Sequence, residues 1–140
     1  MSYFICFTFS LLSTISLAQE NAEDLDSFLW SNRIILINTF SSSAEYISQL
    51  QSANTEITDR DILWFLFSDT EMESNYQGSV GPVLRENMLE NYLPANTERV
   101  ILIGKDGGIK SSNATLDLLD LFAQIDVMPM RRAEIREASQ

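Results

Sequence analysis

Three short, continuous runs of apolar residues constrain the fold of this chain more than any other feature. They occupy residues 33–40, 62–67 and 100–103, and they are rich in β-branched and aromatic side chains. A strand with one face in water alternates apolar and polar residues, whereas a strand buried on both faces is apolar throughout. The sequence therefore predicts a central sheet that helices cover on both sides.

The segments between and after these runs carry apolar residues at helical spacing. Three such stripes predict helices: Tyr46, Ile47, Leu50 and Ala53; Leu84, Met88, Leu89 and Tyr92; and Leu118, Leu119, Phe122 and Ile125. Pro82 suits the first position of the second helix, and we expect the third helix to be capped near Asn113 or Thr115. Residues 131–138 predict one or two further helical turns.

Two polar segments complete the pattern. Residues 105–108 read Lys-Asp-Gly-Gly, which predicts a tight hairpin turn and a returning antiparallel strand from Ile109. Residues 68–78 are polar and acidic and predict a loop. The element order is therefore β-α-β-α-β-β-α, which favours an α/β, thioredoxin-like fold with a mixed central sheet and helices on both faces.

The charge and the residue types exclude several functions. The chain has 140 residues with 20 acids, 9 bases, no histidine and one cysteine, and its net charge is −11. Such a charge repels nucleic acid and anionic lipid, so we expect neither as a partner. Without histidine there is no Ser-His-Asp triad, and one cysteine cannot form an internal disulfide. We expect no cofactor and no metal site.

The N-terminus predicts export. Residues 1–19 carry no charged side chain, and their apolar core ends in Ser16-Leu17-Ala18. This pattern is typical of a secretory signal peptide over residues 1–18, although the segment before its apolar core lacks Lys and Arg. The alternatives are a transmembrane anchor, for which the stretch is short and serine-rich, and a lipoprotein, for which Cys6 lies too early.

Cleavage near Ala18 would remove Cys6 and leave a periplasmic or secreted protein without a stable membrane anchor. Residues 19–27 would form a solvated acidic leader, and residues 28–138 a single domain. At the boundary between the two, Leu25, Phe28, Leu29 and Trp30 predict a short helix or turn that packs an aromatic edge onto the domain.

Four segments resemble a known family: residues 29–33, 60–61, 102–110 and 125–132. On these the chain resembles a small secreted domain-of-unknown-function family that bacteria share with animal sushi-repeat and equarin-type extracellular proteins. That family is placed in a peroxiredoxin-like superfamily with the thioredoxin fold. The resemblance implies this fold and an extracytoplasmic location, and it supplies no catalytic residues.

The resemblance also implies where a redox group would lie, between the first strand and the following helix. Residues 40–45 read Phe-Ser-Ser-Ser-Ala-Glu at that place, and residues 96–99 stand where thioredoxins carry their cis-proline. Serine cannot exchange disulfides, because the reacting species is a thiolate. We therefore expect no thiol redox chemistry from the mature chain.

One candidate ligand site joins Ser41, Ser42 and Ser43 to Arg33 and Arg60. The serines precede a helix whose N–H groups attract anions, and arginines at strand starts, Arg99 among them, bind carboxylate or phosphate bidentately. The alternative is structural: the serines cap the helix, and the arginines pair with neighbouring acids such as Asp59, Asp61 or Glu98.

A second candidate is a docking patch formed by Arg131, Arg132 and Arg136 beside Met128, Pro129 and Met130. Its alternative is a helix whose methionines fill the edge of the core while its arginines face water. Residues 69–73 place acids at alternate positions, but Ser74 stands where a calcium loop needs glycine. We read them as a solvated loop.

These observations lead to two functional hypotheses. The first is an exported, non-catalytic thioredoxin-like domain that binds an unknown protein or a small anionic ligand. The second is a peroxiredoxin-like enzyme with non-thiol chemistry at the Ser41–Ser43 helix start. A third, cation buffering by the acidic surface, rests on net charge alone.

Overall fold

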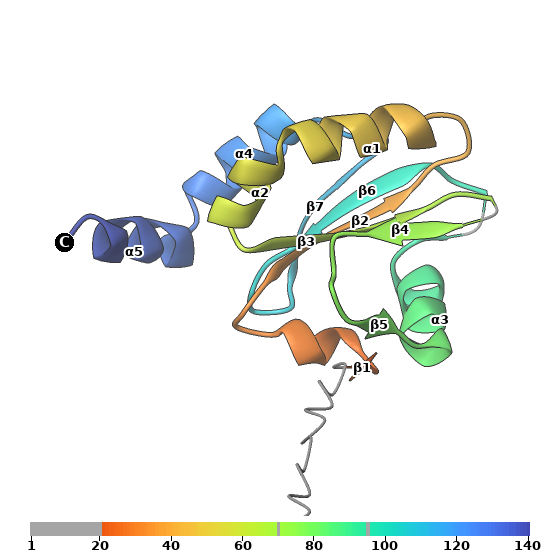
Figure 1. The fold of residues 1–140 in the computed structure, drawn as a ribbon, viewed down its shortest axis with the longest axis horizontal. Helices are drawn as coiled ribbons and strands as arrows, with labels where there is room; N and C mark the ends of the chain where they lie inside the picture. Colours follow the sequence, from red (N-terminus) through yellow and green to blue (C-terminus); the bar gives the residue numbers. More distant parts are fainter. Residues whose placement is uncertain (1–20, 70, 95) are drawn as a thin grey trace, which may run out of the picture.

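A five-stranded mixed sheet forms the centre of the molecule (Figure 1). The computed structural model describes residues 21–69, 71–94 and 96–140, so the predicted signal peptide lies outside the described residues. The strands lie in the order β4 (Met72–Ser74), β3 (Ile62–Phe67), β2 (Arg33–Asn38), β6 (Arg99–Ile103) and β7 (Ile109–Asn113). β2 and β3 are parallel and the other neighbours are antiparallel, as a mixed sheet requires.

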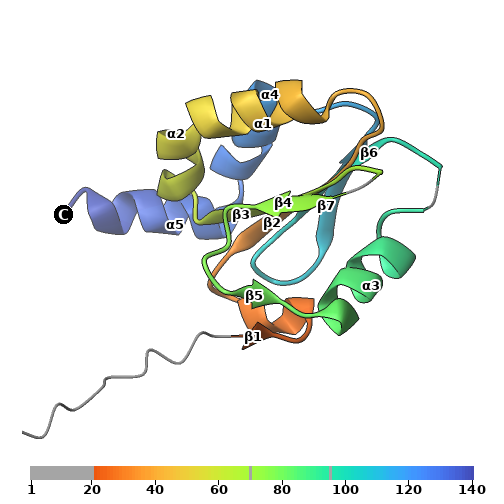
Figure 2. The same cartoon turned by 45° about the vertical axis from the view of Figure 1, so that its right-hand side comes forward.

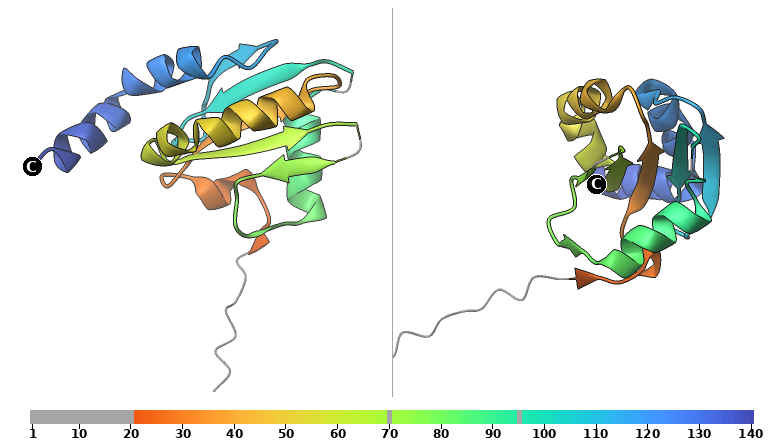
Figure 3. Two further views of the ribbon diagram at one scale, coloured as in Figure 1. Left: turned by 45° about the horizontal axis from the view of Figure 1, so that its top comes forward. Right: turned by 90° about the vertical axis from the view of Figure 1, so that its right-hand side faces the viewer.

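Helices cover both faces of this sheet, as the apolar runs predict. One face carries α1 (Ser43–Ser52), α2 (Asn54–Asp59) and α4 (Leu118–Asp126). The other face carries α3 (Pro82–Asn91) and the short 3-10 helix η1 (Leu25–Phe28). The last helix, α5 (Pro129–Ala138), leads away from one end of the sheet (Figure 3). None of the helices in the described ranges is long and apolar enough to cross a membrane.

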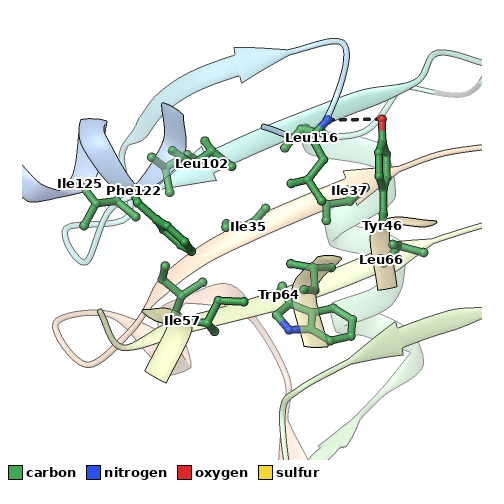
Figure 4. Packing of buried hydrophobic residues seen from close by; sticks show 14 residues of the cluster. Ile35, Ile37, Tyr46, Ile57, Trp64, Leu66, Leu102, Leu116, Phe122 and Ile125 are labelled. Carbon is green, nitrogen blue, oxygen red and sulfur yellow. Dashed lines mark hydrogen bonds between the residues drawn. The ribbon is translucent and has the colours of Figure 1, made fainter. Parts of the chain in front are cut away.

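The central strands place alternate residues in two separate cores. Ile35, Ile37 and Leu66 face α1, α2 and α4, and Figure 4 shows them in one cluster with Trp64. Their sequence neighbours face α3 and η1: Ile34, Leu36, Phe65 and Phe67. Because successive side chains point to opposite faces of a strand, a run without polar residues supplies both cores at once.

The segment predicted as a solvated leader differs from that prediction. β1 (Asn21–Ala22) pairs in parallel with β5 (Ser79–Val80), and Ala22 is buried (Figure 2). Asp24 caps η1 by accepting a hydrogen bond of 3.1 Å from the Ser27 N–H. Residues 21–27 therefore pack on the domain, because Ala22 and Phe28 fill its second core.

The segment predicted as a polar loop contains the edge strand β4. Asn75 extends the pairing beyond β4: its side-chain oxygen accepts from the Trp64 N–H at 2.8 Å, and its amide donates to the Ile62 carbonyl at 3.0 Å. The Asn75 side chain thus pairs with the backbone of β3 in the way that the backbone of a longer β4 would. The loop prediction missed β4 because it relied on polar composition, and an edge strand that buries little apolar surface can also be polar.

Candidate functional site

A carboxylate from a distant part of the chain binds the turn between β2 and α1. Residues 39–42 lead from β2 into α1, and Glu98 lies beside them just before β6. One Glu98 oxygen accepts hydrogen bonds from the Thr39 hydroxyl at 3.2 Å, the Phe40 N–H at 3.1 Å and the Ser41 hydroxyl at 3.2 Å. The Phe40 N–H, followed by the Ser41 hydroxyl, lowers the pKa of Glu98 below its usual value.

The serines play a smaller capping role than the sequence predicts. Ser42 is the N-cap residue of α1, but its side chain makes no capping hydrogen bond. Its N–H instead donates to the Thr39 hydroxyl at 3.2 Å. Glu98 supplies the acceptor at this turn, and the sequence gives no local sign of it because 58 residues separate it from Phe40.

The structure does not bring the candidate ligand site together. Arg33 begins β2, whereas Ser41 follows the end of the same strand, so the arginine and the serines lie at opposite ends of the sheet. Arg60 precedes the parallel strand β3 and stays with Arg33. Arg99 pairs with Asn38 at the start of the antiparallel strand β6, which places it at the serine end. Strand direction, which the sequence pattern leaves open, separates these groups.

Arg33 and Arg60 belong to a cluster that we call the basic end. It contains Arg33, Arg60, Lys105, Lys110 and Arg131, and it lies where β2 and β3 begin, β6 turns into β7, and α5 starts. These are five of the nine bases in a chain of net charge −11. The four segments that carry the family resemblance each contribute to this end.

Glu134 of α5 is the centre of the pairing at the basic end. It accepts two hydrogen bonds from the Arg33 guanidinium, at 3.2 and 3.1 Å, and its carboxylate lies 2.8 Å from the Lys105 ammonium. Arg33 is only 1% exposed. Burial opposes ionisation of Glu134, but the bonds from Arg33 and Lys105 outweigh it and lower its pKa. Sequence reasoning missed Glu134 because Arg33 lies 101 residues away.

Two further arginines join the end of α2 to α4 and to α5. Arg60 donates to both oxygens of Asp126, at 2.9 and 2.7 Å, and lies over the Phe122 ring. Arg131 donates to the Asp59 carboxylate and, at 2.8 Å, to its carbonyl. The hydrogen bond from Arg60 is the main cause that lowers the pKa of Asp126. Burial lowers the pKa of Arg131, but its charge interactions and hydrogen bonds, chiefly with Asp59, raise the pKa by more, so it lies above its usual value.

The predicted docking patch is therefore divided. Arg131 is buried and paired, and it serves the fold, whereas Arg132 and Arg136 are exposed on α5. The structural alternative, in which the arginines face water, therefore fits Arg132 and Arg136 but not the buried Arg131.

A pocket opens beside this network. It has a volume of about 320 Å³, and it is lined by Arg33, Gly104, Lys105, Asp106, Lys110, Met128, Pro129 and Met130. Its lining side chains carry three positive charges and one negative charge. The turn of β6 and β7 forms one wall, and the segment that joins α4 to α5 forms the other.

Trp30 stands beside the same turn in an unusual conformation. It is 66% exposed, its φ is +66°, and its N–H donates to the Lys105 carbonyl at 2.7 Å. A bulky residue seldom adopts the left-handed region, because its Cβ meets the backbone. Strain of this kind is concentrated at functional sites, where surrounding contacts hold it in place.

The carboxylates with shifted pKa values at the two ends are held in their ionised form. A general acid or base works best with a pKa near the working pH. Glu98, Asp126 and Glu134 all have pKa values shifted the other way, below their usual range. They stay ionised and hold their donors in place.

Comparison with known proteins agrees with the fold. Residues 24–134 match the model of a family described as Domain of unknown function (DUF4174). The reduced 2-Cys peroxiredoxin of Plasmodium vivax is similar in structure, with 12% identity, a TM-score of 0.53 and coverage of 78% of this chain and 84% of that chain. Thioredoxin peroxidase I of Plasmodium yoelii gives 15% identity, a TM-score of 0.53 and coverage of 78% and 79%.

No curated protein matches the chain. At identities this low the likeness to the two solved structures shows the fold alone, and it confirms the predicted thioredoxin-like architecture.

Proposed function

The chain belongs to the family described as Domain of unknown function (DUF4174), and since that description assigns no activity, we propose from the site geometry that it is an exported, non-catalytic binding domain. Its binding surface is the basic end. The proposal rests on one observation, which is that the two ends of the sheet differ in what they offer to a ligand. Glu98 closes the redox position, while the pocket and Trp30 lie at the opposite end.

The filled redox position supports a non-catalytic role. A ligand or substrate oxyanion at the start of α1 would meet the Glu98 carboxylate, which already accepts from Phe40 and Ser41. Two negative charges at one site repel each other. Cys6, the single cysteine of the sequence, belongs to the predicted signal peptide, so cleavage would leave hydroxyl groups and no thiol at this turn.

The basic end supports a binding role. Positive side chains beside an exposed tryptophan are the residue types enriched at recognition sites. The strong negative charge elsewhere on the chain directs anionic partners to this end and away from the rest of the surface. Nucleic acid remains excluded from the proposal, because its phosphate density needs a broader basic surface.

Export follows from residues 1–18, whose composition is that of a cleaved signal peptide. The domain would then act in the periplasm or outside the cell, the location that the family resemblance also implies. Mass spectrometry of the protein recovered from outside the cytoplasm tests this directly. A recovered chain that still begins at Met1 contradicts it.

A second candidate function is favoured by one contact. The Ser41 hydroxyl donates to Glu98 at 3.2 Å, as a serine nucleophile would to its base. The lowered pKa of Glu98 weakens it as a base, so this enzyme reading ranks second. It requires ester turnover that Ser41→Ala or Ser42→Ala abolishes.

Site-specific crosslinking distinguishes binding at the basic end from binding elsewhere. A photoreactive phenylalanine derivative replaces Ile109, which is 56% exposed beside the turn, and in a matched control it replaces Val83, which is 67% exposed on α3. In the exporting host we expect a defined adduct from position 109 and none from position 83. Equal labelling, or no adduct from position 109, contradicts the proposal.

A further inference from the structure

We infer that the pocket between the β6–β7 turn and the start of α5 binds a small anion with an apolar tail, such as a short-chain carboxylate. This inference rests on the proposed binding role and names the ligand class. The pocket is lined at one side by Arg33, Lys105 and Lys110 and at the other by Met128, Pro129 and Met130. A ligand that satisfies both walls must carry a negative head and an apolar body.

The size of the pocket suits a small molecule. Ligand pockets commonly run from about 300 to about 1,000 Å³, and this pocket of about 320 Å³ lies at the lower limit. Only a compact ligand fits such a volume. The flexible methionines at its mouth can adapt to the shape of an apolar tail.

The charges around this pocket are paired. Arg33, Lys105, Lys110 and Asp106 line it. Glu134 pairs with Arg33 and Lys105, and Asp61 with Lys105, from outside the lining. An anion therefore gains a cation in this pocket only where one of these pairs can exchange its carboxylate.

Lys110 is the residue that can change partners. Its ammonium lies 2.7 Å from the Asp106 carboxylate, and both side chains are partly exposed. An ion pair in water contributes little to stability, so an anion in the pocket can compete for this lysine. Arg33 and Lys105, in contrast, are buried and stay in their pairs with Glu134 and Asp61.

Gly104 sets the path of the Lys110 side chain. A Cβ at position 104 would lie 2.4 Å from the Lys110 Cε, so the lysine stem crosses the glycine where no side chain stands. Replacement by alanine must displace the stem. This substitution moves the charge without removing it.

The test uses three probes that separate the head from the tail. Hexanoate carries both, acetate lacks the tail, and hexanamide lacks the charge. In NMR titrations of the full chain we expect hexanoate to give saturable shifts at residues 104–110 and 128–130. We expect acetate and hexanamide to bind at least about fivefold more weakly, because each loses one wall of the pocket.

Three variants link the binding to the pocket. Lys110→Gln and Gly104→Ala should each weaken hexanoate binding by about fivefold or more, which corresponds to about 1 kcal/mol. Arg85→Gln, which removes an exposed charge on α3, should leave it unchanged. Melting temperatures of all three variants close to that of the parent chain show that folding is intact.

The results of these titrations and of the crosslinking distinguish failure of this inference from failure of the proposed binding function. Equal binding of hexanoate and hexanamide, shifts outside the pocket, or an unchanged affinity in both pocket variants overturns the inference. If crosslinking from position 109 still gives a defined adduct, the basic end remains the binding surface and only the ligand class is rejected. If hexanoate does not bind in the pocket and crosslinking from position 109 gives no adduct, both the ligand class and the proposed binding surface are rejected.

Discussion

Single residues at the β6–β7 turn illustrate how the backbone fixes the basic end. Gly107 has a φ of +78°, a conformation that glycine adopts without steric cost. A Cβ there would lie 2.8 Å from Leu29 Cδ2 in the segment before β2. The turn therefore depends on this glycine both for its conformation and for its close approach to residues 29–33.

Substitution at Gly107 tests this dependence. Gly107→Ala should lower the free energy of unfolding by about 1–2 kcal/mol, because alanine is strained at positive φ and Leu29 must move. Gly108→Ala is the matched control. Its nearest contact would be at 3.4 Å, so its cost should stay below about 0.5 kcal/mol. Urea unfolding measures both, and equal effects would contradict the argument.

At the scale of elements, the helix starts differ in how they are capped. Asp117 caps α4 by accepting from the Asp120 N–H at 3.0 Å, and it directly precedes the apolar stripe that the sequence shows. The expected caps, Asn113 and Thr115, were wrong, because β7 extends to Asn113. Ser42 precedes α1 without a side-chain capping bond.

This difference gives a paired prediction. Asp117→Ala should lower the free energy of unfolding by about 1 kcal/mol, the usual cost of losing an N-cap. Ser42→Ala should cost only a few tenths of that, because no capping bond is lost. Thermal melting of the two variants makes the comparison, and a larger loss for Ser42→Ala would show that its hydroxyl caps α1 after all.

The attachment of α5 to the sheet depends on Glu134. Glu134→Gln leaves the buried Arg33 without a charged partner, and unpairing a buried ion costs about 3–5 kcal/mol. We expect about 2–3 kcal/mol here, because Glu134 is partly exposed and Lys105 retains Asp61. Glu137→Gln, at an exposed position on α5, should be neutral. Hydrogen exchange should show faster opening of residues 129–138 in the first variant only.

At the scale of the whole molecule, the ion pairs make stability depend on acid. Asp126 and Glu134 have folded-state pKa values below their ordinary values of 3.8 and 4.5. A carboxylate of this kind stabilises the native state above its unfolded-state pKa, and that contribution is lost as the pH falls through the folded-state pKa.

The melting temperature should therefore change little between about pH 5.5 and pH 7.5, where no histidine titrates, and fall steadily below about pH 4.5. Asp126→Asn with Glu134→Gln should be less stable at neutral pH and lose less on acidification. Differential scanning calorimetry over this range measures the effect. A parent chain whose melting temperature is the same at about pH 3 and pH 6 would contradict it.

Local patterns predicted most of the architecture correctly. The runs at 33–40, 62–67 and 100–103 became β2, β3 and β6, and the stripe from Tyr46 became α1. β4 was missed because polar residues form it, and Asn75 completes its pairing through a side chain. The packing of residues 21–27 was missed because acids are frequent in that segment and only Ala22 of its described residues is fully buried, with Leu25 packed beside it.

The candidate sites were predicted less well, for a physical reason. Spacing along the chain identified Arg33 and Arg60 as neighbours at strand starts, and the parallel pairing of β2 and β3 brings them together. It could not show that β6 runs antiparallel to β2 and carries Arg99 to the other end.

By itself, the sequence determined the layered α/β fold, the burial of its strands on both faces and the types of chemistry that the chain lacks side chains to perform. These properties follow from periodicity and composition, which are local. Only the tertiary structure decided that Glu98 meets Phe40 and that Glu134 meets Arg33 and Lys105. Such pairs depend on strand direction and on contacts between distant segments, and no spacing in the sequence records them.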